Sequence, residues 1–374
     1  MMDGQYPFTK GTFILVYLLY LAIVFLAFYF HCREKNNEFS KSPGIFFLLL
    51  FGLLGVYGYI GSDYVNYAFQ IATMEKYGLE NYSSNWETVY LWWIQLIDYS
   101  NTLFRVGVFG TTMLLWYFLC RSVSSKSDII FYSSIFFLPL AINGRVFLAI
   151  LVFFLGVWAL SSRGLWCKIL GILLMAVAFF FHKTCIMLII PFCFVFYIPK
   201  LNISFILLVG LLAMLAGYLL SPFFIFFISN YFPVFSDYLE FDDEKHTFLG
   251  TIVFGIKYGV IILISILEIV ALRNKILPPF EKILYRMLFG IVVSSLAIYS
   301  LRLNTEHIFL RAVIFAVLPM ILLLPEFLLT VKNEKLMGNN IFRMATLGFF
   351  LTTNAFVYLA WKLYFIDGRY LATK

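Results

Sequence analysis

Charged residues are scarce in this chain of 374 residues. Lys, Arg, Asp and Glu together make up 13% of it, whereas hydrophobic residues make up 62%. Soluble globular domains carry about 25% charged residues, so this composition excludes an ordinary soluble protein. The mean hydropathy of +0.92 points the same way. We therefore expect most of the chain to lie within a membrane.

The chain also lacks the weakly alternating segments of about ten residues that are typical of a membrane β-barrel. Apolar runs of about 15 to 22 residues recur instead, and each is near the length that a helix needs to cross a bilayer. These runs predict an all-α polytopic membrane protein, one integral domain over residues 1–374, with about twelve transmembrane helices in a range of about ten to thirteen. The predicted spans are 12–31, 45–60, 102–120, 128–142, 146–160, 166–181, 184–198, 203–228, 250–272, 285–301, 308–328 and 343–361.

Cysteine and histidine are few, with five and four residues respectively. Their spacing fits no known metal-binding pattern, and no Asp-x-Asp motif is present to hold a divalent ion. We therefore expect structural thiols, no metal and no cofactor. No cleavable signal peptide is expected either, because the first apolar run, 12–30, is too long and lacks a small-residue cleavage site.

Basic residues gather in every second loop, which predicts the topology. By the positive-inside rule these loops are cytoplasmic, so both termini are expected on the outer side. The basic residues are Arg33, Lys35, Lys41, Arg121, Lys126, Arg163, Lys168, Lys200, Arg273, Lys275, Lys282, Arg286, Lys332, Lys335 and Arg343. The pI near 9.0 thus reflects topology, and no nucleic-acid partner is expected.

Two of the expected outer-face loops are large, 61–101 and 229–249, and both are acidic. Within the first, the segment Trp86–Asp98 is amphipathic and predicts an interfacial or re-entrant helix. The long run 203–228 is expected to break at Ser221-Pro222, because proline disrupts a helix.

Four arginines conflict with this topology, since they fall at the outer ends of predicted spans. They are Arg105, Arg145, Arg302 and Arg311. Charges at membrane depth face a cavity, pair with an acid or bind an anion. Arginine suits phosphate, because its planar guanidinium binds two oxygens at once. Snorkelling to lipid headgroups is the alternative, and for Arg302 so is pairing with Glu306 one turn away.

Arg145 has a further feature, because it opens a helix directly after Asn143-Gly144. Exposed backbone N–H groups at a helix start add to the positive field. His182 and Lys183 end a span on the same expected face, and His307 stands beside Glu306. Each histidine is either an interfacial residue or part of a site.

Asp63 directly follows a predicted span, where a buried carboxylate could act as a general base. Tyr64 and Tyr67 lie next to it and could stack on sugar rings. Belt residues at the membrane interface are the alternative for both tyrosines.

These residues carry a resemblance to EpsG-like proteins. Gly61–Tyr67 resembles their G-x-D-Y-x-x-Y element, and Phe181–Thr184 resembles their F-H-x-S/T element. Asn143–Ala149 is similar to their N-x-x-R-x-x-(L)A helix, with Asn two residues before Arg rather than three. Arg311, followed by Leu318-Pro319, resembles their late arginine helix. The resemblance covers most of the chain, and these families belong with the Wzy-type polymerases.

The resemblance implies a C-type membrane glycosyltransferase in a bacterial inner (plasma) membrane. It implies transfer of a growing undecaprenyl-diphosphate-linked glycan onto an undecaprenyl-diphosphate-linked repeat unit, at the periplasmic or outer face, in O-antigen (lipopolysaccharide) or capsule assembly. The expected partners are these two lipid-linked oligosaccharides, membrane lipid and a chain-length regulator. The alternatives are an O-antigen ligase and a transporter of the lipid-linked glycan.

Roles for the candidate residues follow from that activity. The diphosphate is expected to bind cationic side chains, and the acceptor hydroxyl to lose its proton to a base. The expected diphosphate-binding residues are Arg145, Arg311, Arg302, Arg105 and Lys183. The candidate bases or orienting groups are Asp63, His182 and Glu306. The expected acceptor or sugar contacts are Tyr64, Asn66, Tyr67, Asn143 and His307.

Overall fold

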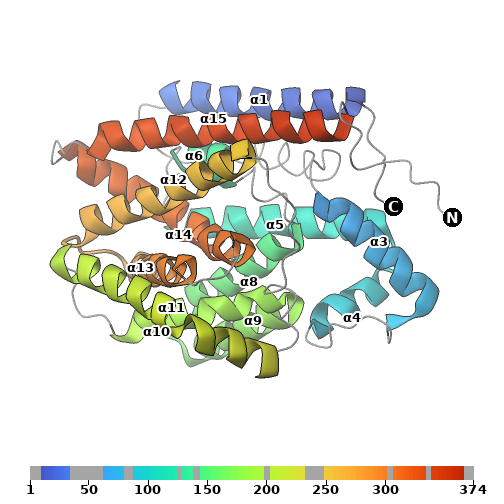
Figure 1. Cartoon of the computed structure of the whole chain (residues 1–374), viewed down its shortest axis with the longest axis horizontal. Coiled ribbons are helices and arrows are strands. Elements are labelled where there is room, and N and C mark those ends of the chain that lie inside the picture. The colour runs from blue at the N-terminus through green and yellow to red at the C-terminus, as the bar shows by residue number, and fades with distance from the viewer. Residues whose placement is uncertain are drawn as a thin grey trace. The chain divides into compact units, whose positions relative to one another are not determined.

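The computed structural model covers the whole chain, and its described residues are almost entirely helical, with no strand among them (Figure 1). The described residues are 10–33, 62–79, 87–123, 128–137, 144–197, 203–231, 248–300, 306–333 and 338–365. Five helices in this part of the chain are long and apolar enough to cross a membrane, namely Asn101–Val123, Gly144–Ser161, Ser204–Phe223, Pro279–Tyr299 and Ala312–Val331. Four shorter apolar stretches accompany them. The chain is therefore an all-α polytopic membrane protein, while the count of about twelve spans stays a prediction.

The chain forms two compact units, Met1–Cys185 with Trp361–Lys374, and Ile186–Ala360. The expectation of a single integral domain stays a prediction. In the first unit the helices are α1 (Lys10–Arg33), α3 (Ser62–Tyr77), α4 (Thr88–Leu96), α5 (Asn101–Val123), α6 (Asp128–Tyr132), α8 (Gly144–Ser161) and α9 (Leu165–Phe181). The π-helix η2 (Ser133–Phe137) continues α6, and the 3₁₀ helix η3 (Lys183–Leu188) follows α9.

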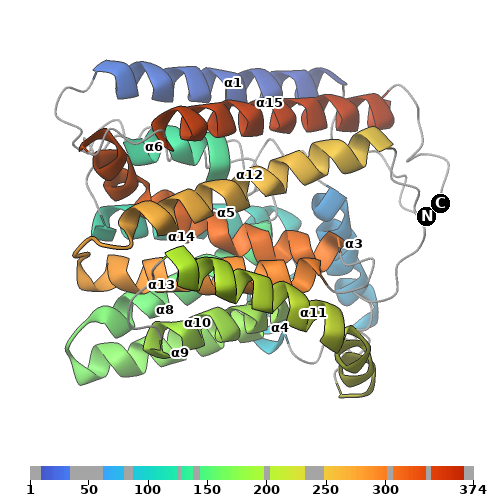
Figure 2. The same cartoon turned by 60° about the vertical axis from the view of Figure 1, so that its left-hand side comes forward.

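The central pair of the first unit is α8 and α9, which run side by side over most of their length (Figure 2). The helix α8 also packs on α5, and α9 packs on α4. Gly156 and Gly171 bring α8 and α9 together, because a Cβ on either residue would lie 2.7 Å from the backbone oxygen of the other. Small residues at such crossings let membrane helices approach closely.

The second unit contains α10 (Ile189–Tyr197), α11 (Ile203–Tyr231), α12 (Phe248–Leu272), α13 (Pro279–Tyr299), α14 (Glu306–Asn333) and most of α15 (Gly338–Phe365). Within it, α13 packs on α10, α11 and α14, and α12 packs on α14. The residues Ala312 to Leu324 of α14 are all buried, so this helix forms the centre of the unit.

Most predicted spans coincide with helices, but four expectations need correction. The loop 61–101 contains two helices, α3 and α4, and the second confirms the helix predicted over Trp86–Asp98. The helix α11 continues through Ser221-Pro222 instead of breaking there. The helix α13 begins six residues before the predicted 285, because Pro279 opens its first turn. The loop 229–249 is shorter at both ends, since α11 ends at Tyr231 and α12 begins at Phe248.

Two predicted segments lie partly or wholly outside the described residues. The span 45–60 is wholly outside them. The span predicted at 128–142 is described only to Phe137, as α6 followed by η2.

The close approach of α8 and α9 leads to a stability prediction. Gly156→Ala should destabilise the protein, because the added Cβ meets the Gly171 backbone oxygen and overpacking costs about 1–3 kcal/mol. Gly110→Ala is the matched control, since a Cβ there meets nothing within 4 Å. The apparent melting temperature in detergent should fall for Gly156→Ala only. Equal melting temperatures for the two variants would contradict tight packing of α8 against α9.

Candidate functional site

Arg145 occupies the first turn of α8, and it is buried although it is charged. The helix begins at Gly144, whose φ of +22° is a backbone conformation that residues with a Cβ rarely adopt. Gly144 also packs against α5, because a Cβ there would lie 3.5 Å from Val108 and from Phe109. Gly144 therefore allows α8 to begin close to α5. Arg145, the next residue, is then buried within the first unit.

The buried charge of Arg145 is balanced by Glu87, the residue before α4. The Arg145 Nη1 donates to Glu87 Oε2 at 2.9 Å, and Glu87 is only 2% exposed. The second carboxylate oxygen, Oε1, accepts a hydrogen bond from the Lys183 backbone N–H at 3.3 Å. Glu87 thereby joins three segments that are distant in the sequence, namely the start of α4, the start of α8 and the turn after α9.

Aromatic rings surround this ion pair. The Arg145 guanidinium carbon lies 4.1 Å from the centre of the Tyr90 ring and 5.4 Å from that of Tyr67. Tyr90 in turn packs edge-on against Phe104 and Phe181. Cation–π contact stabilises a guanidinium, more so where water is excluded. The rings also lower the local dielectric, so charges inside this site interact more strongly than they would in water.

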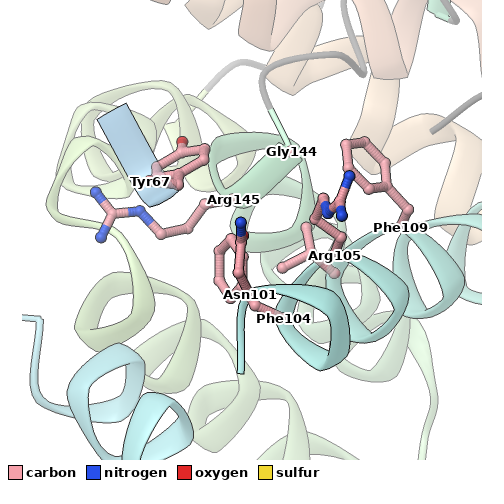
Figure 3. A pocket seen from close by; sticks show the side chains of 8 residues that line it. Tyr67, Asn101, Phe104, Arg105, Phe109, Gly144 and Arg145 are labelled. Atoms are coloured by element: carbon pink, nitrogen blue, oxygen red, sulfur yellow. The ribbon is translucent and has the colours of Figure 1, made fainter. Parts of the chain in front are cut away.

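A small pocket lies beside Arg145, between α3, α5 and the start of α8 (Figure 3). Its empty volume, including the part open to solvent, is about 250 Å³. Its lining residues are Tyr67, Asn101, Phe104, Arg105, Val108, Phe109, Gly144 and Arg145.

Two basic side chains therefore line one pocket. In Figure 3 the Arg145 guanidinium lies beside the Tyr67 ring, and Arg105 projects from α5 on the other side of Asn101. The Asn101 Oδ1 is buried without a hydrogen-bond partner in the part of the chain that the structure describes. Buried polar atoms in native structures are nearly always satisfied, so this oxygen marks a place where a donor group of a bound molecule would be stabilised.

His182 directly follows α9 and is 3% exposed. Its Nδ1 lies 2.7 Å from Thr184 Oγ1, and the Thr184 backbone N–H donates to the same nitrogen at 3.3 Å. Lys183, between them, is half-buried. The Lys183 backbone N–H thus binds this turn to Glu87, and the Thr184 backbone N–H binds to the His182 ring.

The structure brings together part of the predicted site. Arg145, Arg105 and Tyr67 line the pocket. The Lys183 backbone N–H is linked to Arg145 through Glu87, and His182 precedes Lys183 in the same turn. The remaining predicted residues fall into two groups. Asp63, Tyr64 and Asn66 lie on α3, and Glu306, His307 and Arg311 lie in the first turns of α14, but their side chains are outside the described part of the structure. Asn143 and Arg302 lie wholly outside the described residues.

Two residues of the site were missed by sequence reasoning: Glu87 and Asn101. Glu87 lies within the loop 61–101, which the sequence identifies only as acidic. A usable signal does exist, because Glu87 immediately precedes a helix, Thr88–Leu96, that contains no charged residue and three aromatic ones. An acid at the edge of such an apolar helix is a candidate for burial with a partner.

Metal ligation has no candidate in this part of the structure. Among the described residues, no group of three or more His, Cys, Asp or Glu side chains could hold a metal ion. Metal-independent chemistry stays a prediction, because some of the candidate acids have undescribed side chains.

The arrangement can bind and stabilise an anion. A guanidinium held in a water-poor, aromatic surrounding offers strong charge stabilisation at fixed geometry. Its present counter-ion, the Glu87 carboxylate, shows that an oxyanion fits against Arg145.

Comparison with known proteins agrees with the resemblance. The model of the EpsG family matches residues 40–366, which is most of the chain. No curated protein and no solved structure matches the chain.

The buried ion pair leads to a stability prediction. Glu87→Leu alone should destabilise the protein by about 3–5 kcal/mol, because it leaves the Arg145 charge buried without its carboxylate. Adding Arg145→Met should recover most of that loss, since an apolar pair of similar size replaces a buried ion pair at little cost. Thermal unfolding of the purified variants in detergent measures both effects. Additive losses in the double variant would show that the two side chains are not energetically coupled.

Proposed function

The chain belongs to the EpsG family, and from this premise we propose that it is a polysaccharide polymerase of bacterial surface-glycan assembly. The proposed reaction transfers a growing glycan from undecaprenyl diphosphate to the sugar end of a second undecaprenyl-diphosphate-linked repeat unit. The observation that carries the proposal is the buried, aromatic-lined Arg145 at the edge of a pocket that also contains Arg105.

The donor determines what such a site must do. Its leaving group is a lipid diphosphate that enters laterally from the bilayer and gains negative charge as the glycosyl bond breaks. Groups that stabilise charge developing in the transition state accelerate the reaction. Arg145 and Arg105 supply that stabilisation in the proposal. Their position at the outer ends of predicted spans sets them at the depth of the outer headgroups, given the proposed orientation with both termini outside.

The acceptor side is proposed from the sequence elements of the family resemblance. Tyr67 lines the pocket, and Tyr64 and Asn66 share the helix α3 with it. Asp63, on the same helix, and Glu306, at the start of α14, are the proposed candidates for accepting the proton of the acceptor hydroxyl. Arg302, Arg311, Asn143 and His307 are proposed to contribute further contacts to the diphosphate or the sugars.

The proposed transfer takes place in the bacterial plasma membrane, at its periplasmic or outer face. The proposed partners are the two lipid-linked oligosaccharides and a chain-length regulator. An O-antigen ligase would use the same donor and the same arginines, but the phenotypes of their loss differ. Loss of a polymerase leaves single repeats attached to the cell surface, whereas loss of a ligase leaves none.

The proposal predicts the effect of Arg145 variants on glycan length. In cells that lack the native gene, Arg145→Ala should abolish long glycan chains and leave single repeats, because the diphosphate loses its principal cation. Arg145→Lys should retain partial activity, since lysine keeps the charge but not the two-oxygen contact of arginine. The gel ladder of extracted surface glycan, with membrane insertion checked in parallel, provides the measurement.

Arg163→Ala is the matched control for this experiment. Arg163 is an exposed arginine two residues beyond the C-terminal end of α8, so its loss should leave the ladder unchanged. A normal ladder from an inserted Arg145→Ala protein would refute the proposed site. Complete absence of attached repeats would favour the ligase.

A further inference from the structure

Asn101 lines the pocket beside Arg145 with a side chain that is half-buried. Its Oδ1 is buried and has no hydrogen-bond partner among the described residues. An amide oxygen accepts hydrogen bonds and cannot donate them. Because a buried acceptor without a donor is destabilising, folding alone does not account for asparagine at this position.

Helix capping does not account for Asn101 either. An asparagine at a helix start commonly caps the helix by accepting a backbone N–H. In α5 the cap is Ser100, whose Oγ accepts from the Leu103 N–H at 3.3 Å and whose carbonyl accepts from the Phe104 N–H at 2.9 Å. Asn101 is the first residue of α5 after this cap. Its side chain is therefore left for a contact outside the helix.

The place of Asn101 in α5 sets it among cationic side chains. Asn101, Arg105 and Val108 are three or four residues apart, so they share one face of the helix, and all three line the pocket. In Figure 3 the Asn101 side chain lies between those of Arg145 and Arg105. A guanidinium only donates hydrogen bonds. The pocket thus combines two groups that bind acceptors with one oxygen that requires a donor.

The proposed substrate has three parts, and only one of them can satisfy Asn101. The polyprenyl chain has no polar hydrogen. The ionised diphosphate only accepts hydrogen bonds, so it suits the arginines and not the amide oxygen. The glycan alone carries donors, namely hydroxyl groups and, on amino sugars, acylamino N–H groups. Because the arginines line the same pocket, the sugar that reaches Asn101 is the one attached to the diphosphate.

We propose that Asn101 Oδ1 accepts a hydrogen bond from a hydroxyl or acylamino N–H group of the sugar attached to the diphosphate, which makes Asn101 a specificity-determining residue for the lipid-linked donor. The inference rests on the proposed function and deepens it, because it assigns the glycan end of the donor to the start of α5. A site built to hydrogen-bond a substrate group discriminates against molecules that lack the group. Asn101 itself makes or breaks no covalent bond.

Binding of two lipids to the purified protein tests this contact. The probes are undecaprenyl diphosphate alone and undecaprenyl diphosphate that carries only the first sugar of the native repeat unit. Asn101→Leu removes the acceptor but keeps a side chain of similar size. Its affinity for the sugar-bearing lipid should fall about tenfold, the equivalent of one hydrogen bond to a buried acceptor. Its affinity for the bare lipid should equal that of the native protein.

Thr102→Val is the matched control. Thr102 is the next residue of α5, but it is exposed and does not line the pocket, so both affinities should stay native.

Thermal unfolding separates binding from folding. Oδ1 has no partner to lose in the described part of the chain, so Asn101→Leu should unfold at the native temperature or above it. Asn101→Ala, which leaves more space in the pocket, should show the same selective loss for the sugar-bearing lipid.

Two results would overturn the inference and leave the proposed function standing. Equal losses for the two lipids would show that the Asn101 amide binds the diphosphate and not the sugar. Native affinity of Asn101→Leu for both lipids would place Asn101 outside the donor site. Failure of the proposed function gives a different pattern: the native protein would bind neither lipid, the Arg145→Ala ladder would be normal, and both proposals would fall.

Discussion

A guanidinium buried among apolar helices is stable only if an anion and suitable contacts compensate for its lost hydration. Arg145 meets that constraint through Glu87 at 2.9 Å and through the faces of Tyr90 and Tyr67. The rest of the site depends on this interaction. It fixes the start of α4 against the start of α8, and through the Lys183 N–H it also fixes the turn that carries His182.

The ion pair of Arg145 and Glu87 also bears on the proposed binding of diphosphate. A site that binds a diphosphate transiently needs a counter-ion while it is empty, because an uncompensated charge in a water-poor surrounding is costly. A carboxylate held by a single guanidinium nitrogen contact can be exchanged for phosphate oxygens, which bind arginine with two contacts. In the proposed function, Glu87 is the resting partner of Arg145, and the diphosphate oxygens replace it when the donor binds.

The sequence predicted what depends on local patterns and missed what depends on tertiary contact. Apolar runs located most helices, and the conflict between Arg145 and the charge topology identified the central residue. Glu87 was missed because its partner lies 58 residues away in sequence, a pairing that no local period encodes. The predicted break at Ser221-Pro222 was wrong, because α11 accommodates Pro222 within a continuous helix. The helix α4 was predicted within the loop 61–101, whereas α3 was missed because its mixed polar and aromatic sequence gives only a weak helical period.

Binding of the lipid carrier itself tests the central claim most directly. The measurement is the affinity of the purified protein for undecaprenyl diphosphate, in the native protein and in the variant that carries both Glu87→Leu and Arg145→Met. In that variant the buried charges are removed as a pair, so the fold is retained. The account predicts that the affinity falls by at least about tenfold, the equivalent of one lost charge-assisted contact of about 1.5–3 kcal/mol. Equal affinity in the two folded proteins would contradict it and would make Arg145 and Glu87 a structural ion pair alone.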